Sequence, residues 1–319
     1  MKASVIIPTK NPGSIFRKVL SAVINQKTPW EYEILVVDSG SDDGTVEYAS
    51  QHHNVRLHEI KPSEFGHGRT RNLGIGLTTG EYVVLITHDA LPANDAWLRN
   101  LVDAVEQSPS IAGAFGRHKA YTSDGPYVAR DLEAHFNGFK SSPPVVSLDD
   151  EVRYRKEAGY RQFLHYFSDN NACLRRSVWE RIPYPDVDFA EDQIWAKKII
   201  EQGYSKAYAD NALVYHSHQF GFWETCQRSF DEAMALNRLF GYKLCPSVHQ
   251  LFGQALLTTI ADIRYSISRR QFKNEMLWVL RSPLRNMFRQ VGYYFGQRYR
   301  ALSDSVILFM SRDKRLLKN

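Results

Sequence analysis

The sequence predicts a doubly wound, Rossmann-like α/β fold with a mostly parallel sheet and a helical C-terminal extension. Over residues 1–120, short apolar runs alternate with amphipathic helical segments, which is the pattern of strands joined by crossover helices. From Phe222 onward, apolar residues recur at the three- and four-residue spacings of helices. With 43% hydrophobic and 24% charged residues, the chain has the composition of a globular protein with a sizeable core.

The first 60 residues are predicted to form three strands and two helices. Residues 3–9 (ASVIIPT) form a short apolar strand, and residues 15–24 carry apolar side chains at helical spacing. The second strand, residues 32–40, contains a β-branched run typical of a parallel sheet that is buried on both faces. Ser and Asp residues in SDDGT can cap a short helix over 46–52, and the third strand follows at 55–60.

The same alternation continues to residue 118. Helical segments at 68–80 and 95–107 flank a fourth strand at 81–87, and a fifth strand follows at 111–118. The second of these helices has a clear apolar face formed by Trp97, Leu98, Leu101, Val102 and Val105. Because strands alternate with helices, we expect a mostly parallel sheet.

The pattern is weaker after residue 120. Residues 121–165 include SSPPVVSLDD and are predicted to be an irregular, mobile segment with one short helix. Order resumes at 170–182, followed by an amphipathic helix over 190–204 and a strand over 211–220 that ends in a histidine pair. We therefore predict a catalytic domain over 1–220 and a basic, amphipathic helical region over 221–319.

Charge is distributed unevenly along the chain. The net charge is +5, yet residues 264–319 hold 13 Lys and Arg against 3 Asp and Glu, so the first 263 residues are net acidic. A basic appendage on an acidic body predicts a separate anionic partner. Three cysteines without metal-ligand spacing indicate reduced thiols in a cytoplasmic protein, and the N-terminal apolar run is too short for a signal peptide.

Several nucleotide-binding and hydrolase motifs are missing from the sequence. No GxGxxG follows the first strand, which argues against a dinucleotide fold. The chain contains neither the P-loop pattern GxxxxGK[ST] nor the nucleophile motif GxSxG. The candidate site must therefore come from other polar residues.

Polar residues stand at the ends of three predicted strands. In doubly wound sheets, ligands bind beyond the carboxyl ends of the strands, where Thr9, Asp38 and Asp89 are expected to meet. Asp38 could orient a nucleotide base by accepting from its N–H. Asp89 could hold a divalent cation that bridges two phosphates. The set fits a nucleoside diphosphate ligand.

Two further pairs supply charge for such a ligand. Arg69 and Arg71 could neutralise a diphosphate, because guanidinium groups bind phosphate oxygens in a bidentate manner. Glu191 and Asp192 stand at the start of a predicted helix, where a carboxylate could act as a general base.

Four segments together resemble the successive motifs of family-2 inverting glycosyltransferases with the GT-A fold. These segments are SVIIPTKN, ILVVDSGSDDGT, FGHGRTRNLGIGLTTGEYVVLITHDALP and FAEDQIWAKKIIEQGY, and the likeness covers about residues 3–220. Within that family, HGRTRNLG followed by T-x-D-A-L-P is most similar to bacterial rhamnosyltransferases that use dTDP-L-rhamnose. The resemblance implies a GT-A type fold and an inverting sugar transfer.

The resemblance also implies roles for individual residues. Asp192 matches the base that deprotonates the acceptor, and Asp89 matches the last, metal-binding position of the family's DxD motif. His216 or His218 falls where related enzymes carry a histidine near the metal, and we favour His216. The donor-binding positions that we infer are Pro8, Thr9, Asp38, Arg69, Arg71, His88 and Glu191. The implied cofactor is a divalent cation, Mg²⁺ or Mn²⁺, although Thr87 replaces the first Asp of DxD.

Two alternative functions stay open. The donor could be a UDP-hexose or a UDP-N-acetylhexosamine rather than dTDP-rhamnose. A non-catalytic module that binds nucleotides or carbohydrates is a different class of function, which Thr87 favours and which the presence of Asp89 and Asp192 disfavours.

The basic C-terminal region has three interpretations. It could be a solvated helical surface, or bind nucleic acid, for which no recognition motif is present. We favour an anionic membrane surface, because aromatic residues interleave with the arginines. The expected location is then cytoplasmic and peripheral, on the inner face of a bacterial cell membrane. The acceptor there would be a glycan or lipid-linked saccharide in the synthesis of a cell-surface polysaccharide such as O-antigen.

Overall fold

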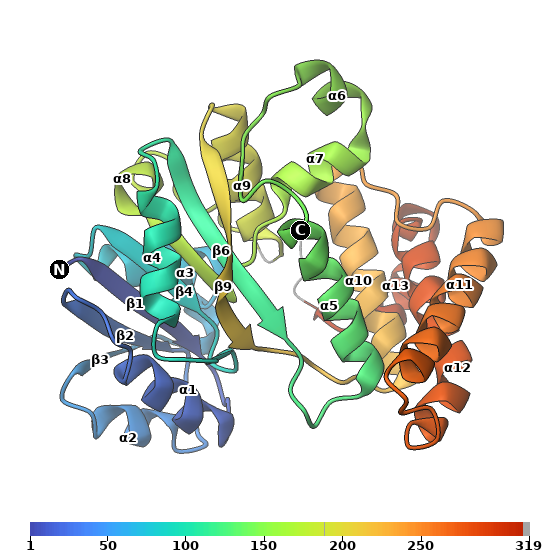
Figure 1. The fold of residues 1–319 in the computed structure, drawn as a ribbon, viewed down its shortest axis with the longest axis horizontal. Coiled ribbons are helices and arrows are strands. Elements are labelled where there is room, and N and C mark those ends of the chain that lie inside the picture. Colours follow the sequence, from blue (N-terminus) through green and yellow to red (C-terminus); the bar gives the residue numbers. More distant parts are fainter. Residues whose placement is uncertain (188, 315–319) are drawn as a thin grey trace. The chain divides into compact units, whose positions relative to one another are not determined.

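A computed structural model describes residues 1–187 and 189–314, which form two compact units (Figure 1). The N-terminal unit comprises residues 1–121 and 132–217, and the C-terminal unit comprises residues 122–131 and the chain from His218 onward. Helix α5 (Pro126–Lys140) therefore begins in one unit and ends in the other.

The N-terminal unit is built on one nine-stranded sheet with the order β3-β2-β1-β4-β8-β6-β9-β5, and β7 pairs with β9. The strands are β1 (Ala3–Thr9), β2 (Tyr32–Asp38), β3 (Val55–Glu59), β4 (Tyr82–Ile86), β5 (Leu91–Pro92), β6 (Ile111–Lys119), β7 (Val145–Val146), β8 (Asn171–Arg175) and β9 (Ser205–Tyr215). Strands β1 to β4 are mutually parallel, and β6 and β9 are parallel to each other. Strand β8 runs antiparallel between β4 and β6. The prediction of a mostly parallel α/β sheet is confirmed.

The remaining elements of this unit are helices that connect the strands. They are α1 (Ile15–Ile24), α2 (Thr45–Ser50), η1 (Pro62–Glu64), α3 (His67–Gly76), α4 (Trp97–Glu106), α6 (Glu151–Lys156), α7 (Ala158–His165), α8 (Arg176–Trp179) and α9 (Glu191–Glu201).

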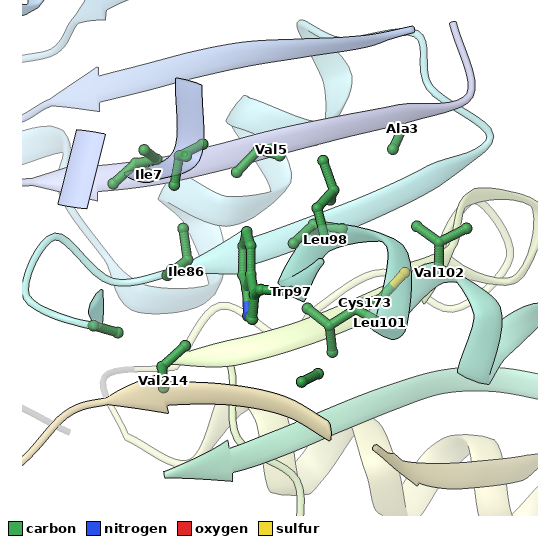
Figure 2. Packing of buried hydrophobic residues seen from close by; sticks show 14 of the residues in the cluster. Ala3, Val5, Ile7, Ile86, Trp97, Leu98, Leu101, Val102, Cys173 and Val214 are labelled. Carbon is green, nitrogen blue, oxygen red and sulfur yellow. The ribbon is translucent and has the colours of Figure 1, made fainter. Parts of the chain in front are cut away.

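Both faces of the sheet are covered, because alternate strand residues point to opposite sides. On one face, Val5 and Ile7 of β1 join a core cluster with Trp97 and Leu98 of α4 (Figure 2). On the other face, Ile6 lies in a second cluster that includes side chains of α3 and α9. A strand buried on both sides has to be apolar throughout, which explains the run VIIP of β1.

The segment 121–165 differs from its prediction as irregular chain with one short helix. It forms three helices, of which α5 is the longest, with 15 residues. The apolar pattern of α5 is interrupted by Arg130 and Asp131, which resemble a solvated face in the sequence but form an ion pair with each other. Strand β9 also starts six residues before the predicted 211 and ends at Tyr215, so the two histidines follow the strand.

The C-terminal unit is helical, as the spacing of its apolar residues predicted. It consists of α10 (Phe222–Phe240), α11 (Val248–Ser268), α12 (Met276–Gly296), η2 (Tyr299–Ala301) and α13 (Asp304–Met310), with the start of α5. Helices α10 and α12 approach closely, since a Cβ on Gly292 would lie 2.2 Å from the carbonyl oxygen of Cys226. Among the described residues, no helix is both long enough and apolar enough to cross a membrane.

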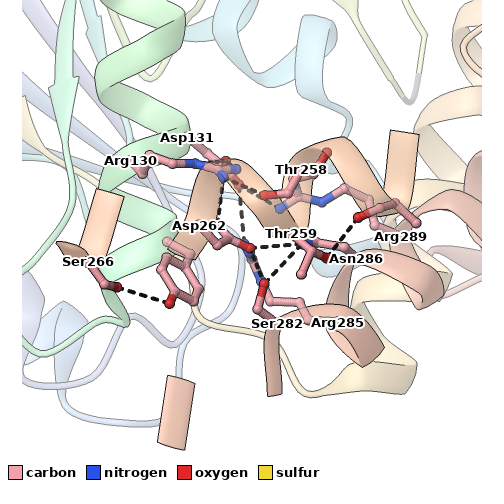
Figure 3. Close-up of polar contacts among 12 residues, drawn as sticks. Arg130, Asp131, Thr258, Thr259, Asp262, Ser266, Ser282, Arg285, Asn286 and Arg289 are labelled. Carbon is pink, nitrogen blue, oxygen red and sulfur yellow. Dashed lines mark hydrogen bonds and ion pairs between the residues drawn. The ribbon is translucent and has the colours of Figure 1, made fainter. Parts of the chain in front are cut away.

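A buried polar network holds this unit together (Figure 3). Asp262 is fully buried and accepts from Asn286 at 2.8 Å and from Ser282, and its other carboxylate oxygen lies 2.6 Å from Arg130. Asp131 lies 2.6 Å from Arg289 and also contacts Arg130 and Arg285. Burial alone would raise the pKa of Asp131, but Arg289, Arg130 and Arg285 lower it to about 2.

We predict that Asp131→Asn destabilises the fold by roughly 2–3 kcal/mol at neutral pH, because it leaves three partly buried arginines without their shared anion. The folded pKa is depressed, so this stabilisation is full above the unfolded pKa of about 4 and is lost as pH falls toward 2. Denaturant unfolding at several pH values measures the difference between wild type and variant. The exposed Asp103→Asn is the matched control, and an equal effect of the two substitutions at neutral pH would contradict the prediction.

Candidate active site

Thr9 and Asp38 meet at the carboxyl ends of β1 and β2, where they are paired in the sheet register. The Thr9 hydroxyl donates to Asp38 at 2.8 Å, and the backbone N–H groups of Gly40 and Ser41 donate to the other carboxylate oxygen at 2.8 and 2.7 Å. Asp38 is fully buried. Its carboxylate therefore fixes the loop that follows β2, and Pro8, one residue before Thr9, lies at the same strand end.

Asp89 and His216 come together from two different strands. Asp89 follows β4 and His216 follows β9, and the Nε2 atom of His216 lies 3.5 Å from a carboxylate oxygen of Asp89. Tyr121 donates its hydroxyl to the backbone carbonyl of Asp89 at 2.8 Å. His218, two residues further along, is exposed and is the first residue of the C-terminal unit.

These residues fit a divalent cation. A carboxylate oxygen and an imidazole nitrogen are both metal ligands, and at 3.5 Å they can contact one ion. The hydroxyl oxygen of Thr87, at the first position of T-x-D, is buried and has no hydrogen-bond partner in the part of the chain that the structure describes. A buried oxygen without a partner carries a free-energy cost, which a bound ion or its water shell would remove.

His88 links this site to the end of β1. The backbone N–H of Lys10, next to Thr9, donates to the Nδ1 atom of His88 at 3.4 Å. The loops after β1 and β4 thus lie side by side, as expected for neighbouring parallel strands.

A second group of charged residues surrounds Arg71, and we call Arg71, Asp169, Tyr184, Glu191 and Asp192 the Arg71 cluster. The buried Arg71 guanidinium lies 2.7 Å from Glu191 and 3.2 Å from Asp169. Tyr184 donates its hydroxyl to Asp169 at 2.6 Å, and the backbone N–H of Asp169 donates to the Asp192 carboxylate at 3.3 Å. Two carboxylates therefore pair with one buried cation, and the third, Asp192, lies beside them.

The excess of carboxyl groups over guanidinium groups shifts the pKa values within the Arg71 cluster. Although burial disfavours its charge, Glu191 and Asp169 hold the pKa of Arg71 above its ordinary value. Burial raises the pKa of Asp169, against the opposing charge of Arg71. Burial, with the charges of Glu191 and Asp169, raises the pKa of Asp192 well above its ordinary value. Asp192 has no ion pair among the described residues, so its proton is the one most open to transfer.

The Arg71 cluster lies at the same edge of the sheet as Asp89. Asn171 begins β8 and pairs with Ile86, the last residue of β4. Asp169, two residues before Asn171, therefore lies beyond the carboxyl end of β4. The backbone of Ala190 takes the left-handed conformation, with φ of 55°, and this sharp turn begins α9 at Glu191 and Asp192. Left-handed non-glycine residues are strained and concentrate at functional sites.

Arg69 has different surroundings from Arg71. It is exposed and forms a bidentate pair with the exposed Asp186, at 3.0 Å. The donor contacts that we inferred for Arg69, Arg71 and Glu191 stay predictions. In the structure, the Arg71 guanidinium and the Glu191 carboxylate form an ion pair with each other.

Asp169 and Tyr184 are members of the Arg71 cluster that sequence reasoning missed. Asp169 stands in SDNN immediately before the buried strand β8, and such a polar run next to an apolar strand is the signal that could have found it. Tyr184 lies between two prolines and gives no such signal.

Comparison with known proteins gives consistent results. The family model described as "Glycosyl transferase family 2" matches residues 4–181. O-antigen chain rhamnosyltransferase RfbN of Salmonella typhimurium is 32% identical, with 100% of this chain and 97% of the relative covered. WbaN, the O-antigen chain rhamnosyltransferase of Salmonella anatum, is 27% identical over 99% and 96%.

A solved structure shows the same fold. Mannosyltransferase PcManGT from Pyrobaculum calidifontis, in complex with GDP-Man and Mn²⁺, has a TM-score of 0.59 at 19% identity and covers 95% of this chain and 87% of its own. The fold expected from the sequence motifs, GT-A with a helical C-terminal part, is confirmed.

We predict that Arg71→Met destabilises the protein by roughly 3–5 kcal/mol, because the buried carboxylates lose their cation. The loss should grow between about pH 5 and pH 8, since carboxyl groups with raised folded pKa values resist ionisation as pH rises. Denaturant unfolding at both pH values measures it. Arg69→Met, two residues away, is the matched control and should cost less than about 1 kcal/mol as an exposed pair. If Arg71→Met and Arg69→Met lowered the free energy of unfolding equally, the Arg71 cluster would not be important for stability.

Proposed function

Because this chain belongs to glycosyl transferase family 2, we propose that it transfers L-rhamnose from dTDP-β-L-rhamnose to a glycan or lipid-linked saccharide with inversion. The similarity to two O-antigen rhamnosyltransferases over nearly the full chain supports rhamnose as the sugar. The same relatives support synthesis of a cell-surface polysaccharide. Residues 1–220 would form the catalytic domain.

Asp192 is proposed as the general base. Its supporting observation is that it alone of the three clustered carboxylates lacks an ion-pair partner among the described residues, while its pKa is raised. A base works best when its pKa lies near the operating pH. We infer that Asp192 removes the proton from the acceptor hydroxyl as that oxygen attacks the sugar. One displacement inverts the anomeric carbon, so a β-linked donor gives an α-linked rhamnoside.

Arg71 is proposed to position this base. Paired with Glu191 and Asp169, it holds the start of α9 and the residue whose N–H donates to Asp192. Thr9 and Asp38 would shape the nucleotide pocket through the loop after β2. Pro8, Arg69 and His88 are proposed to line the donor site.

Asp89 and His216 would hold the cation. Their 3.5 Å separation supports this proposal, as does the Thr87 hydroxyl, which finds no hydrogen-bond partner within residues 1–187 and 189–314. When bound, Mg²⁺ or Mn²⁺ neutralises charge on the diphosphate leaving group. The solved mannosyltransferase with Mn²⁺ is a relative in fold that carries such an ion.

We expect Asp192→Asn to lower the transfer rate about 10²–10⁴-fold while leaving the Kd for the donor within about threefold, because the base acts on the acceptor. Because the pKa of Asp192 is raised, the wild-type rate should increase with pH at higher pH values than the value near 4 at which an ordinary carboxyl group titrates. Release of dTDP and transfer of labelled rhamnose measure both. Asp103→Asn, an exposed carboxyl on α4 outside the proposed site, is the control. Equal slow turnover in wild type and both variants would favour a binding module without catalysis.

A thermal-shift panel of nucleotide sugars, with and without Mg²⁺ or Mn²⁺, tests the donor and the ion. We expect dTDP-rhamnose with a cation to raise Tm most, since a ligand stabilises only the folded state that binds it. Asp89→Ala should abolish the cation-dependent part of the shift. A larger shift with UDP-glucose or UDP-N-acetylglucosamine would replace the proposed donor.

A further inference from the structure

Helix α11 is built with its polar side inward and its apolar side outward. The inner side buries Thr259, Asp262 and Ser266, each less than 9% exposed. The apolar residues at spacings of four, four, three and four, which we call the outer stripe, are Phe252, Leu256, Ile260, Ile263 and Ile267. An amphipathic helix in water normally buries such a stripe.

Apolar residues are most exposed near the start of the helix, where the inner side buries Leu251 and Ala255. Phe252 is 58% exposed and Leu256 is 61% exposed, and the neighbouring Leu257 is exposed as well. Helix α12 shows the same tendency, since Ser282 and Asn286 are buried while Leu280 is 70% exposed. The buried polar network described above explains the inner side (Figure 3). It does not explain why the outer residues are apolar.

The exposed charges in the sequence segment that contains the outer stripe are all positive. Between residues 248 and 284 the only acidic residues are Asp262 and Glu275, and both are buried. Arg264, Lys273 and Arg281 are exposed. An apolar stripe in a segment whose exposed charges are all positive complements a surface that is apolar inside and anionic at its rim. A second copy of the same helix would instead bring like charges together.

A groove of about 440 Å³ adjoins the outer stripe. Its lining includes Leu257, Ile260 and Arg264 of α11 and Arg130 of α5. Arg130 is already paired with Asp131 and Asp262, whereas Arg264 is exposed at the groove. Apolar walls beside an arginine suit a phosphate-bearing lipid headgroup and the first part of its chains.

We propose that the outer stripe of α11 binds the surface of an anionic lipid bilayer, with Arg264 and Lys273 contacting lipid phosphates. This gives the expected membrane partner a defined surface, and it does not depend on which sugar is transferred. The apolar side chains enter the headgroup region while the helix lies parallel to the surface, as in other interfacial helices.

Flotation with vesicles tests this proposal on the full chain without donor or acceptor. Wild type should float with phosphatidylcholine vesicles that contain roughly one third phosphatidylglycerol, and stay at the bottom with phosphatidylcholine alone. Phe252→Gln with Leu256→Gln should lower the partition coefficient at least about tenfold. Arg264→Gln with Lys273→Gln should lower it about 25-fold, or about fivefold per charge.

Val152→Gln with Arg155→Gln is the matched control, because both residues are exposed on α6 in the N-terminal unit. It should float like wild type, and all variants should keep the wild-type Tm, since only exposed side chains change. The proposal is rejected if wild type does not bind the anionic vesicles, or if the Phe252/Leu256 variant binds them equally well. It is also rejected if light scattering shows that wild type is a dimer and the Phe252/Leu256 variant a monomer, while both float equally. Loss of flotation with unchanged transfer to a water-soluble acceptor would separate this surface from the proposed activity.

Discussion

The candidate active site of this fold depends on one buried cation, the Arg71 guanidinium, which has more carboxylates around it than it can pair with. Arg71 lies on α3, and Glu191, 120 residues later, begins α9. A buried guanidinium is tolerated only with its carboxylates in place, and the carboxylates are tolerated only with the guanidinium. The packing of α3, the loop before β8 and the start of α9 is therefore one electrostatic unit. The third carboxylate, Asp192, is held at its edge without a salt-bridge partner of its own among the described residues.

Much of this arrangement could be predicted from residues that break an apolar pattern. Thr9, Asp38 and Asp89 stand where buried strands end, and the carboxyl ends of neighbouring parallel strands must lie together. The structure joins Thr9 to Asp38 and Asp89 to His216. Asp169 was not assigned in this way, because it precedes a strand instead of following one, and its partner Arg71 is remote in sequence; the polar run before β8 is the signal that marks it. The reversed direction of β8 was likewise hidden, since an apolar run carries no sign of its direction.

In the C-terminal unit the helices were predictable and their orientation was not. The apolar period of α11 is clear in the sequence, but a period does not say which side is buried. Asp262, with hydrogen-bonding partners on α12 and an ion pair to Arg130, determines the inner side here. The helix is oriented so that Asp262 is buried with its several partners, although this leaves Phe252 and Leu256 exposed. Arg130 and Asp131 misled the prediction for α5 for the same reason.

The C-terminal unit is also discontinuous along the chain, and this limits how such enzymes can exchange parts. Residues 122–131 contribute Tyr127, whose hydroxyl forms a hydrogen bond with the hydroxyl of Ser266. They also contribute the Arg130–Asp131 pair, which joins the buried network. A tail transplanted from a relative at a single junction near residue 218 would meet a foreign first turn of α5. Recombination that preserves the network must exchange residues 122–131 together with the tail, which takes three coordinated crossovers. The helical tail is therefore expected to be inherited together with this ten-residue insert rather than as an independent cassette.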